Sequence, residues 1–108
     1  MYKVRKREGK IVSFDINKID SAIKKAFDSV DRKYDDNVID FLALKVTADF
    51  EPKLKNNIVS VEDIQDSVEA VLSAAGYGDV AKSYILYRKQ HEKMRNMKST
   101  LLDYKDVV

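Results

Sequence analysis

Cysteine is absent from the chain, and histidine, proline and glycine are scarce. Without cysteine the protein can form no disulfide, no thiolate zinc site and no cysteine nucleophile. The single histidine, His91, has no partner at metal-ligand spacing, so we interpret it as a surface residue and expect no metal-based hydrolysis. With three glycines and one proline among 108 residues, the chain has the composition of an ordered, helix-rich protein.

Long apolar stretches are missing as well. No run approaches the roughly 20 residues needed to cross a bilayer, and residues 1–10 lack the apolar segment of a signal peptide. We therefore expect a cytoplasmic protein. Hydrophobic residues make up 44% and charged residues 35%, so a chain of this length can bury one modest core. We predict one domain over residues 1–95, followed by a linker over residues 96–108.

Positive charge is concentrated near the N-terminus. Residues 1–25 contain eight Lys or Arg residues and three acidic residues, a net charge of +5, whereas the whole chain carries +2. Such a segment suggests a localised anion site, although an ordinary solvated surface explains the same charges.

The first fourteen residues predict a β-hairpin. Residues 2–7 alternate apolar and basic side chains, Glu8 and Gly9 can turn the chain, and residues 11–14 form a second β-prone run. An isolated hairpin is only marginally stable in water, so we expect it to pack on the rest of the chain.

Apolar side chains then recur at helical spacings of three and four residues. They predict four helices: residues 16–30, residues 38–51, residues 61–75, and a fourth helix that begins after the connection 76–79. The short connection makes the third and fourth helices antiparallel neighbours. The expected fold is mainly α, a four-helix bundle capped by an N-terminal β-hairpin.

Local signals mark the ends of these helices. Asp15 or Asn17 can cap the first helix, and Ser60 opens a capping box before the third. Pro52 makes continuation of the second helix unfavourable, and Gly76 stands where a left-handed helix stop is easiest.

The hairpin is also the most informative segment for function. Its basic side chains in residues 4–10 (VRKREGK), together with Lys18 from the first helical turn, could converge on a triphosphate. Each charge-assisted contact would contribute about 1.5–3 kcal/mol, and free amides at a helix start could add to it. A basic hairpin edge also protects against strand-to-strand aggregation, so both interpretations stand at this point.

The common glycine-rich phosphate loops are missing. The sequence contains neither G-x-x-x-x-G-K-[ST] nor G-x-G-x-x-G, so any nucleotide site must be built differently. Adjacent carboxylates such as Glu62 and Asp63 stand at presumed helix starts, where capping explains them, and we assign no catalytic residue.

Residues 84–89 (YILYRK) form a second segment of interest on the fourth helix. Stripes of this kind usually belong to a core, so Tyr84 is interpreted as a packing residue. Arg88 could either pair with an acidic side chain or reach a phosphate, and the sequence leaves both open.

Four segments, in this order and spacing, resemble the ATP-cone family over about residues 2–95: VRKREGK at 4–10, SFDINKI at 13–19, VEDIQDSV at 61–68 and AKSYILYR at 81–88. The resemblance implies a β-hairpin that caps a four-helix bundle, with a nucleotide beneath the hairpin. It also implies an allosteric regulatory domain with ATP as activator and dATP as inhibitor, with Mg²⁺ as an optional companion of the phosphates.

The resemblance further implies a role for individual residues. Val4 and Ile19 would border the adenine, and Asp15 would lie near the base or the ribose. On the third helix, where some members have a threonine and a phosphate-facing histidine, this chain has Val61 and Gln65, and glutamine can donate a hydrogen bond but carries no charge. The phosphates would be met by basic side chains from the hairpin and the first helix, namely Lys6, Arg7 and Lys18, with Arg88 as a further candidate.

ATP-cones occur at the front of ribonucleotide reductases and in the bacterial repressor of their genes. The repressor places a four-cysteine zinc ribbon before its cone, whereas here Met1 directly precedes the hairpin, which resembles a reductase N-terminus. Residues 101–105 (LLDYK) are similar to the exit toward an anaerobic, glycyl-radical ribonucleoside-triphosphate reductase. We therefore expect that parent, an oligomer whose catalytic domain and other subunits are the partners, and no enzymatic activity in residues 1–108.

Three alternatives remain at this stage. The first is the ATP-cone of the transcriptional repressor. The second is a nucleic-acid-binding module, because the fourth helix carries a row of basic residues that could lie along a phosphate backbone: Arg88, Lys89, Lys93, Arg95 and Lys98. The third is a plain helical interaction module with no ligand.

Overall fold

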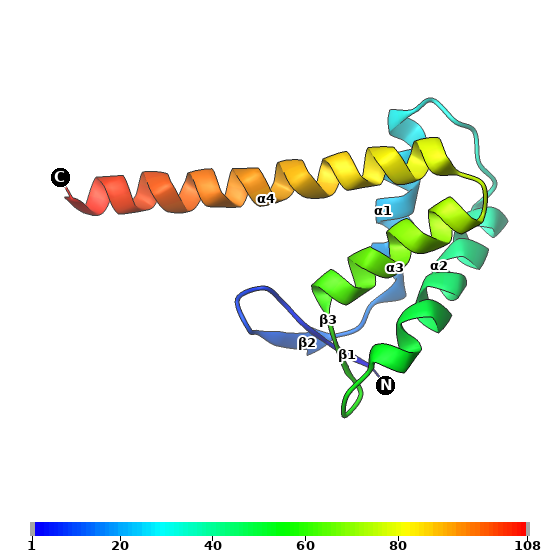
Figure 1. Ribbon diagram of the computed structural model, residues 1–108, viewed down its shortest axis with the longest axis horizontal. Helices are drawn as coiled ribbons and strands as arrows, with labels where there is room; N and C mark the ends of the chain where they lie inside the picture. The colour runs from blue at the N-terminus through cyan, green and yellow to red at the C-terminus, as the bar shows by residue number, and fades with distance from the viewer. Residues whose placement is uncertain (1, 108) are drawn as a thin grey trace.

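The computed structural model describes the backbone of residues 2–107 and the side chains of residues 2–93. Four helices stand against a small three-stranded sheet in the order β2-β1-β3 (Figure 1). The elements in chain order are β1 Lys3–Arg5, β2 Ile11–Ser13, α1 Ile16–Ser29, α2 Asp36–Phe50, the short 3₁₀ helix η1 Glu51–Lys53, β3 Ile58–Ser60, α3 Val61–Ala74 and α4 Gly78–Val107. The mainly α fold with an N-terminal hairpin and four helices is therefore confirmed.

The helices begin where their caps predict. The side chain of Asp15 accepts a hydrogen bond from the Asn17 backbone N–H at 3.0 Å, and Ser60 Oγ accepts one from the Asp63 N–H at 3.1 Å. Each bond satisfies an amide that the first helical turn leaves without a carbonyl partner. α3 stops at Gly76, whose φ of +90° is the left-handed conformation that glycine adopts most readily.

The sheet holds one strand more than the sequence patterns indicate. We expected a two-stranded hairpin, and the structure adds β3 directly after a turn at residues 56–57. β3 runs parallel to β1 with Val4 opposite Val59, so β1 becomes the central strand. Because β3 passes into α3 without an intervening residue, the start of α3 is held beside the hairpin.

The core lies between α1, α2 and α3 and extends under the sheet. Its fully buried side chains come from all four helices and from β3, and the largest are Phe27, Phe50, Ile23, Ile39, Leu42, Leu72, Val46, Val59, Val68 and Val80. The rings of Tyr2 and Phe14 both pack edge-on against Phe50 and are tilted against each other, with ring centroids 5.5–6.2 Å apart. This cluster fastens the hairpin to α2, as an otherwise unstable two-stranded unit requires.

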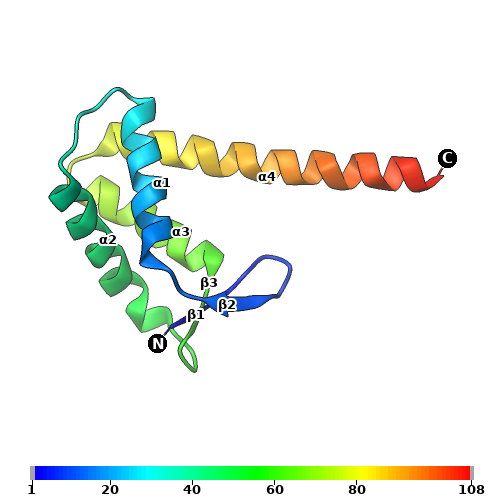
Figure 2. The same ribbon diagram turned by 180° about the vertical axis from the view of Figure 1, so that it is seen from behind.

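α4 packs against α1 and α3 and then projects beyond the body on the side where the hairpin also extends (Figures 1 and 2). α3 and α4 run back past each other as expected, but they diverge toward the hairpin. The backbone of α4 continues as helix to Val107. The side chains of the expected linker, residues 96–108, lie outside the described residues, so the boundary at residue 95 stays a prediction. Over the part of the chain that the structure covers, no helix is both long and apolar enough to cross a membrane.

Candidate functional site

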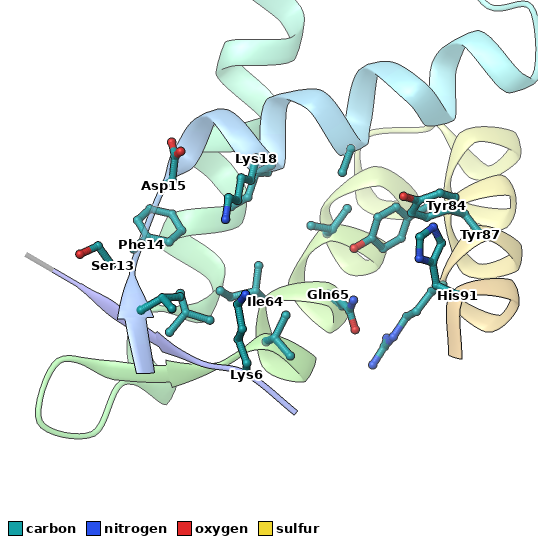
Figure 3. A pocket seen from close by; sticks show the side chains of 17 residues that line it. Lys6, Ser13, Phe14, Asp15, Lys18, Ile64, Gln65, Tyr84, Tyr87 and His91 are labelled. Atoms are coloured by element: carbon teal, nitrogen blue, oxygen red, sulfur yellow. The ribbon is translucent and has the colours of Figure 1, made fainter. Parts of the chain in front are cut away.

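A cleft of about 290 Å³ opens where α1 and α4 diverge. The hairpin forms one wall, the first turns of α1 and α3 form two more, and the middle of α4 forms the fourth (Figure 3). Three parts of the sequence that are far apart, residues 4–22, 61–68 and 84–91, therefore meet at one place, and β3 brings the α3 wall next to the hairpin.

The floor of the cleft is apolar. Val4, Ile19 and Ile64 are 8%, 5% and 8% exposed, so their side chains belong to the core and show only one face to the cleft. The apolar lining comes from both strands of the hairpin, α1 and α3: Val4, Val12, Phe14, Ile19, Ala22, Val61, Ile64 and Val68. A surface of this kind suits a flat, weakly polar ring system.

Two lysines reach over this floor from opposite walls. Figure 3 shows the ammonium group of Lys6, from the hairpin, and that of Lys18, from α1, directed toward one another across the hollow. Within residues 2–93 neither lysine lies within ion-pair distance of a carboxylate. Two cations held in this way attract an anion with several negative charges.

The guanidinium of Arg88 also lines the cleft, but acidic side chains hold it. Its Nη1 donates to Asp66 Oδ1 at 2.9 Å and to Glu69 Oε1 at 2.8 Å, both on α3. Partial burial lowers the pKa of Arg88, but these hydrogen bonds and charges outweigh that effect and raise it. Of the two roles that the sequence left open for Arg88, the structure therefore shows the acid pair, and contact with a phosphate stays a prediction.

Arg7 is the one candidate residue that the structure places outside the cleft lining. Its Nη2 donates to Gln65 Oε1 at 3.2 Å, and the same guanidinium lies 3.6 Å from Glu62 and 3.9 Å from Glu92. Arg7 thus links the hairpin to α3 and α4. Of the three cations expected to converge, Lys6 and Lys18 line the cleft and Arg7 does not.

The remaining candidates line the cleft. Val61 and Gln65 stand on the α3 wall. Asp15 lies at the edge, where its carboxylate caps α1 and points away from the hollow in Figure 3. Capping accounts for this residue, and its expected position near a base or a ribose stays a prediction.

Comparison with known families decides what this arrangement belongs to. A model of the ATP cone domain matches residues 2–93, the larger part of the chain. The chain belongs to the ATP-cone domain family. The resemblance expected from the sequence is confirmed at this level.

Relatives of this ATP-cone are ribonucleotide reductases. The vitamin B12-dependent ribonucleoside-diphosphate reductase of Mycobacterium tuberculosis strain H37Rv is 42% identical over 99 residues, which are 92% of this chain and 13% of the reductase. The enzyme with the same name from Thermoplasma acidophilum is 42% identical over 109 residues, 96% of this chain and 14% of the enzyme. The ribonucleoside-diphosphate reductase subunit alpha of Chlamydia pneumoniae is 34% identical over 96 residues, 83% of this chain and 9% of that subunit.

This ATP-cone thus spans about one seventh or less of the length of the three relatives. Their names correct one expectation from the sequence. The anaerobic triphosphate reductase that residues 101–105 suggested is not among them, and the relatives are B12-dependent enzymes and an alpha subunit instead.

The α4 wall of the cone holds residues that the sequence analysis did not assign to a site. Tyr84 is 5% exposed, so its packing role is confirmed, and His91 is exposed as expected, but both also line the cleft together with Tyr87. Burial raises the pKa of Tyr84 to about 12, so its hydroxyl keeps its proton at neutral pH. These residues stand three or four positions apart around Arg88, a spacing that places them on one helix face and could have pointed to them.

Proposed function

We propose that this ATP-cone binds an adenine nucleotide in the cleft and thereby regulates a ribonucleotide reductase, without changing the nucleotide chemically. The observation that carries the proposal is the pair Lys6 and Lys18, which face each other above an apolar floor. The base would lie on the floor beside Val4 and Ile19, and the phosphates would lie between the two ammonium groups.

The magnitudes favour a nucleotide with several phosphates. Each lysine that meets a phosphate in a charge-assisted hydrogen bond contributes about 1.5–3 kcal/mol, whereas an ordinary neutral hydrogen bond contributes about 1 kcal/mol. Because the two lysines stand on different elements, a polyphosphate would also hold the hairpin and α1 together. A nucleoside without phosphates would gain only the apolar contact.

Regulation requires a difference between two bound states. ATP and dATP differ by one hydroxyl group, so each would have to favour a different packing of the cone against its surroundings. α4 is the element through which this difference would be transmitted, because it lines the cleft with Tyr84, Tyr87 and Arg88 and then projects beyond the body.

The parent protein that the relatives support is a ribonucleoside-diphosphate reductase of the B12-dependent or subunit-alpha kind. The partners would then be the catalytic part of that reductase and its other subunits in an oligomer. The repressor of reductase genes is less well supported, since the relatives at 34–42% identity are reductases. Arg88 no longer supports the nucleic-acid alternative, because two carboxylates pair with its guanidinium. The side chains of Arg95 and Lys98 lie outside the described residues.

Calorimetric titration of the 108-residue chain with ATP, dATP and GTP tests the proposal. We expect both adenine nucleotides to bind, and each of the variants Lys6→Ala and Lys18→Ala to lose roughly 10-fold to 100-fold in affinity, the equivalent of one charge-assisted contact. Lys33→Ala is the matched control, because this exposed lysine lies between α1 and α2, away from the cleft. Repeating the titrations with EDTA shows whether Mg²⁺ accompanies the phosphates. Absence of binding by either adenine nucleotide at millimolar concentration would overturn the proposal.

A further inference from the structure

His91 is the only histidine in the chain, and it lines the cleft from the α4 wall (Figure 3). Its imidazole packs against Tyr87 one turn earlier, with ring centroids 4.3 Å apart. The side chain is exposed, so a ligand in the cleft could reach it. Neither capping nor core packing accounts for a histidine at this position.

The direction in which His91 points follows from how α4 is held. Tyr84 is buried in the core, and Arg88 forms ion pairs with Asp66 and Glu69 of α3. These two attachments set the rotation of α4 about its axis. Since His91 lies on the same face as Arg88, its imidazole lines the cleft while it stays open to solvent.

The charged groups around the cleft determine which form of the imidazole is favoured. The hairpin contributes Lys6, and α1 contributes Lys18 and, at the edge, Asp15. The acidic groups of α3 and α4 near the cleft pair with arginines: Glu62 and Glu92 with Arg7, and Asp66 and Glu69 with Arg88. The phenols of Tyr84 and Tyr87 are the remaining titratable groups on the α4 wall. A polyanion bound among these cations would add negative charge to the cleft, and negative charge nearby favours a protonated imidazole.

We infer that His91 is a phosphate-binding residue of the cleft, that a bound polyphosphate favours its imidazolium form, and that nucleotide affinity consequently depends on pH. This inference rests on the proposed nucleotide site and adds a third cation to it, from the α4 wall. Gln65 on α3 carries no charge, and His91 is the imidazole among the side chains that line the cleft.

The direction in which affinity changes with pH follows from the linkage between proton binding and ligand binding. If the ligand binds the protonated form of His91 more tightly, His91 takes up a proton when the ligand binds, and affinity rises as pH falls. The terminal phosphate of the nucleotide also gains a proton near pH 6, which reduces its charge for every variant alike. The informative quantity is therefore the ratio of affinities between wild type and variant, measured at each pH.

The first experiment uses the single histidine as its own reporter. Proton NMR of the 108-residue chain follows the imidazole signals of His91 through a pH titration, with and without saturating ATP. We expect the titration midpoint to move upward by about one pH unit when ATP is bound, which corresponds to a tenfold preference of ATP for the protonated form.

The second experiment measures ATP affinity by calorimetry at pH 6 and pH 8. The ratio of wild-type affinity to that of His91→Gln is expected to be about six times larger at pH 6 than at pH 8, by the same linkage. His91→Lys carries a charge at both pH values and should bind ATP as tightly as wild type at pH 6, and more tightly than wild type at pH 8. Melting curves of both variants establish that they fold.

The outcomes separate this inference from the proposed function. If ATP binds wild type but leaves the His91 titration unmoved and the wild-type to His91→Gln ratio constant with pH, His91 is not a phosphate-binding residue and the nucleotide site stands without it. If ATP at millimolar concentration does not bind wild type at either pH, the nucleotide site itself fails, and the role of His91 fails with it.

Discussion

α1 and α4 meet closely at one end of the molecule and separate at the other. Side chains contact one another at the closed end and line a cleft at the open end. At the closed end, Phe27 packs between Tyr34 and Tyr77 with ring centroids 5.6 and 5.1 Å away. Arg32 pairs with Asp79 at 2.6 Å and lies over the Tyr77 ring. The aromatic rings and charged groups at this end thus interact with one another within the protein.

At the open end, the corresponding groups face the cleft. Lys18 and Tyr87 lie across from each other on α1 and α4, and Lys6 approaches from the hairpin. The lysines have no carboxylate partner among residues 2–93, and the apolar floor beneath them is covered only in part. The comparison shows that the closed end provides stability, whereas the open end leaves its cations and apolar surface to a ligand.

Breaking the closed end should have the largest effect on stability. Phe27 is 1% exposed, so Phe27→Ala leaves a cavity and is expected to lower the free energy of unfolding by about 3–5 kcal/mol. Urea denaturation measures this loss. Phe41→Ala, at a side chain that is 56% exposed on α2, is the control and should change stability by less than about 1 kcal/mol.

The link between α4 and α3 at the open end should matter less. Arg88→Met removes the partner of both Asp66 and Glu69, whose side chains are 54% and 26% exposed. Because solvent screens such pairs, we expect a loss of only about 1 kcal/mol in the free energy of unfolding. A loss as large as that of Phe27→Ala would show that the open end contributes to stability as much as the closed end does.

A smaller effect is expected where Arg7 borders the cleft. Glu62→Gln and Glu92→Gln each remove a negative charge near the cleft and one of the carboxylates that pair with Arg7. ATP affinity should rise a few-fold in each variant, since exposed charges of this kind act through a screened field. Calorimetry at two salt concentrations tests this, and a fall in affinity would mean that Arg7 supports the site only while it is tied to α3 and α4.

The smallest change is expected at Asp20, on the side of α1 that faces α2. Burial raises the pKa of Asp20, and the neighbouring carboxyl of Asp40 raises it further, while Lys24 opposes them. With its folded pKa above the unfolded value, Asp20 stabilises the fold at low pH, and this contribution is lost as pH rises through the folded pKa.

Asp20→Asn should therefore be more stable than wild type at pH 7, with a difference that shrinks as the solution is acidified. Thermal melts at pH 4 and pH 7 measure it, and Asp28→Asn, at an exposed position of the same helix, is the control. A wild type that is the more stable protein at pH 7 would contradict the prediction.

The features predicted correctly depend on residues close together in the chain. Asp15 and Ser60 cap helices by binding amides two and three positions away, and Gly76 ends α3 through its own backbone conformation. By contrast, β3 went unpredicted. β1 and β2 are equally short, but they are joined by a turn that signals a hairpin, whereas residues 58–60 pair with β1, which lies more than fifty positions earlier.

The cleft divides in the same way. Lys6 and Arg7 are neighbours with equal charge, so the family resemblance treated them alike, yet the structure turns Lys6 into the cleft and Arg7 toward Glu62 and Glu92. Tyr84 and His91 were read as core and surface from their residue types, and both descriptions hold. Their spacing already places both on one face of α4, but only the angle at which α4 crosses α1 makes that face a wall of a cleft.

By itself the amino-acid sequence determined the existence of four helices, the caps of α1 and α3, the hairpin and the family, because hydrophobic periodicity, capping and turn formation act over a few residues. Only the tertiary structure decided that β1 is central, that α1 and α4 close at one end and open at the other, and which cations face the opening. The physical reason is that strand pairing, helix divergence and ion pairs such as Arg7 with Glu92 depend on distances in space between residues far apart in the chain.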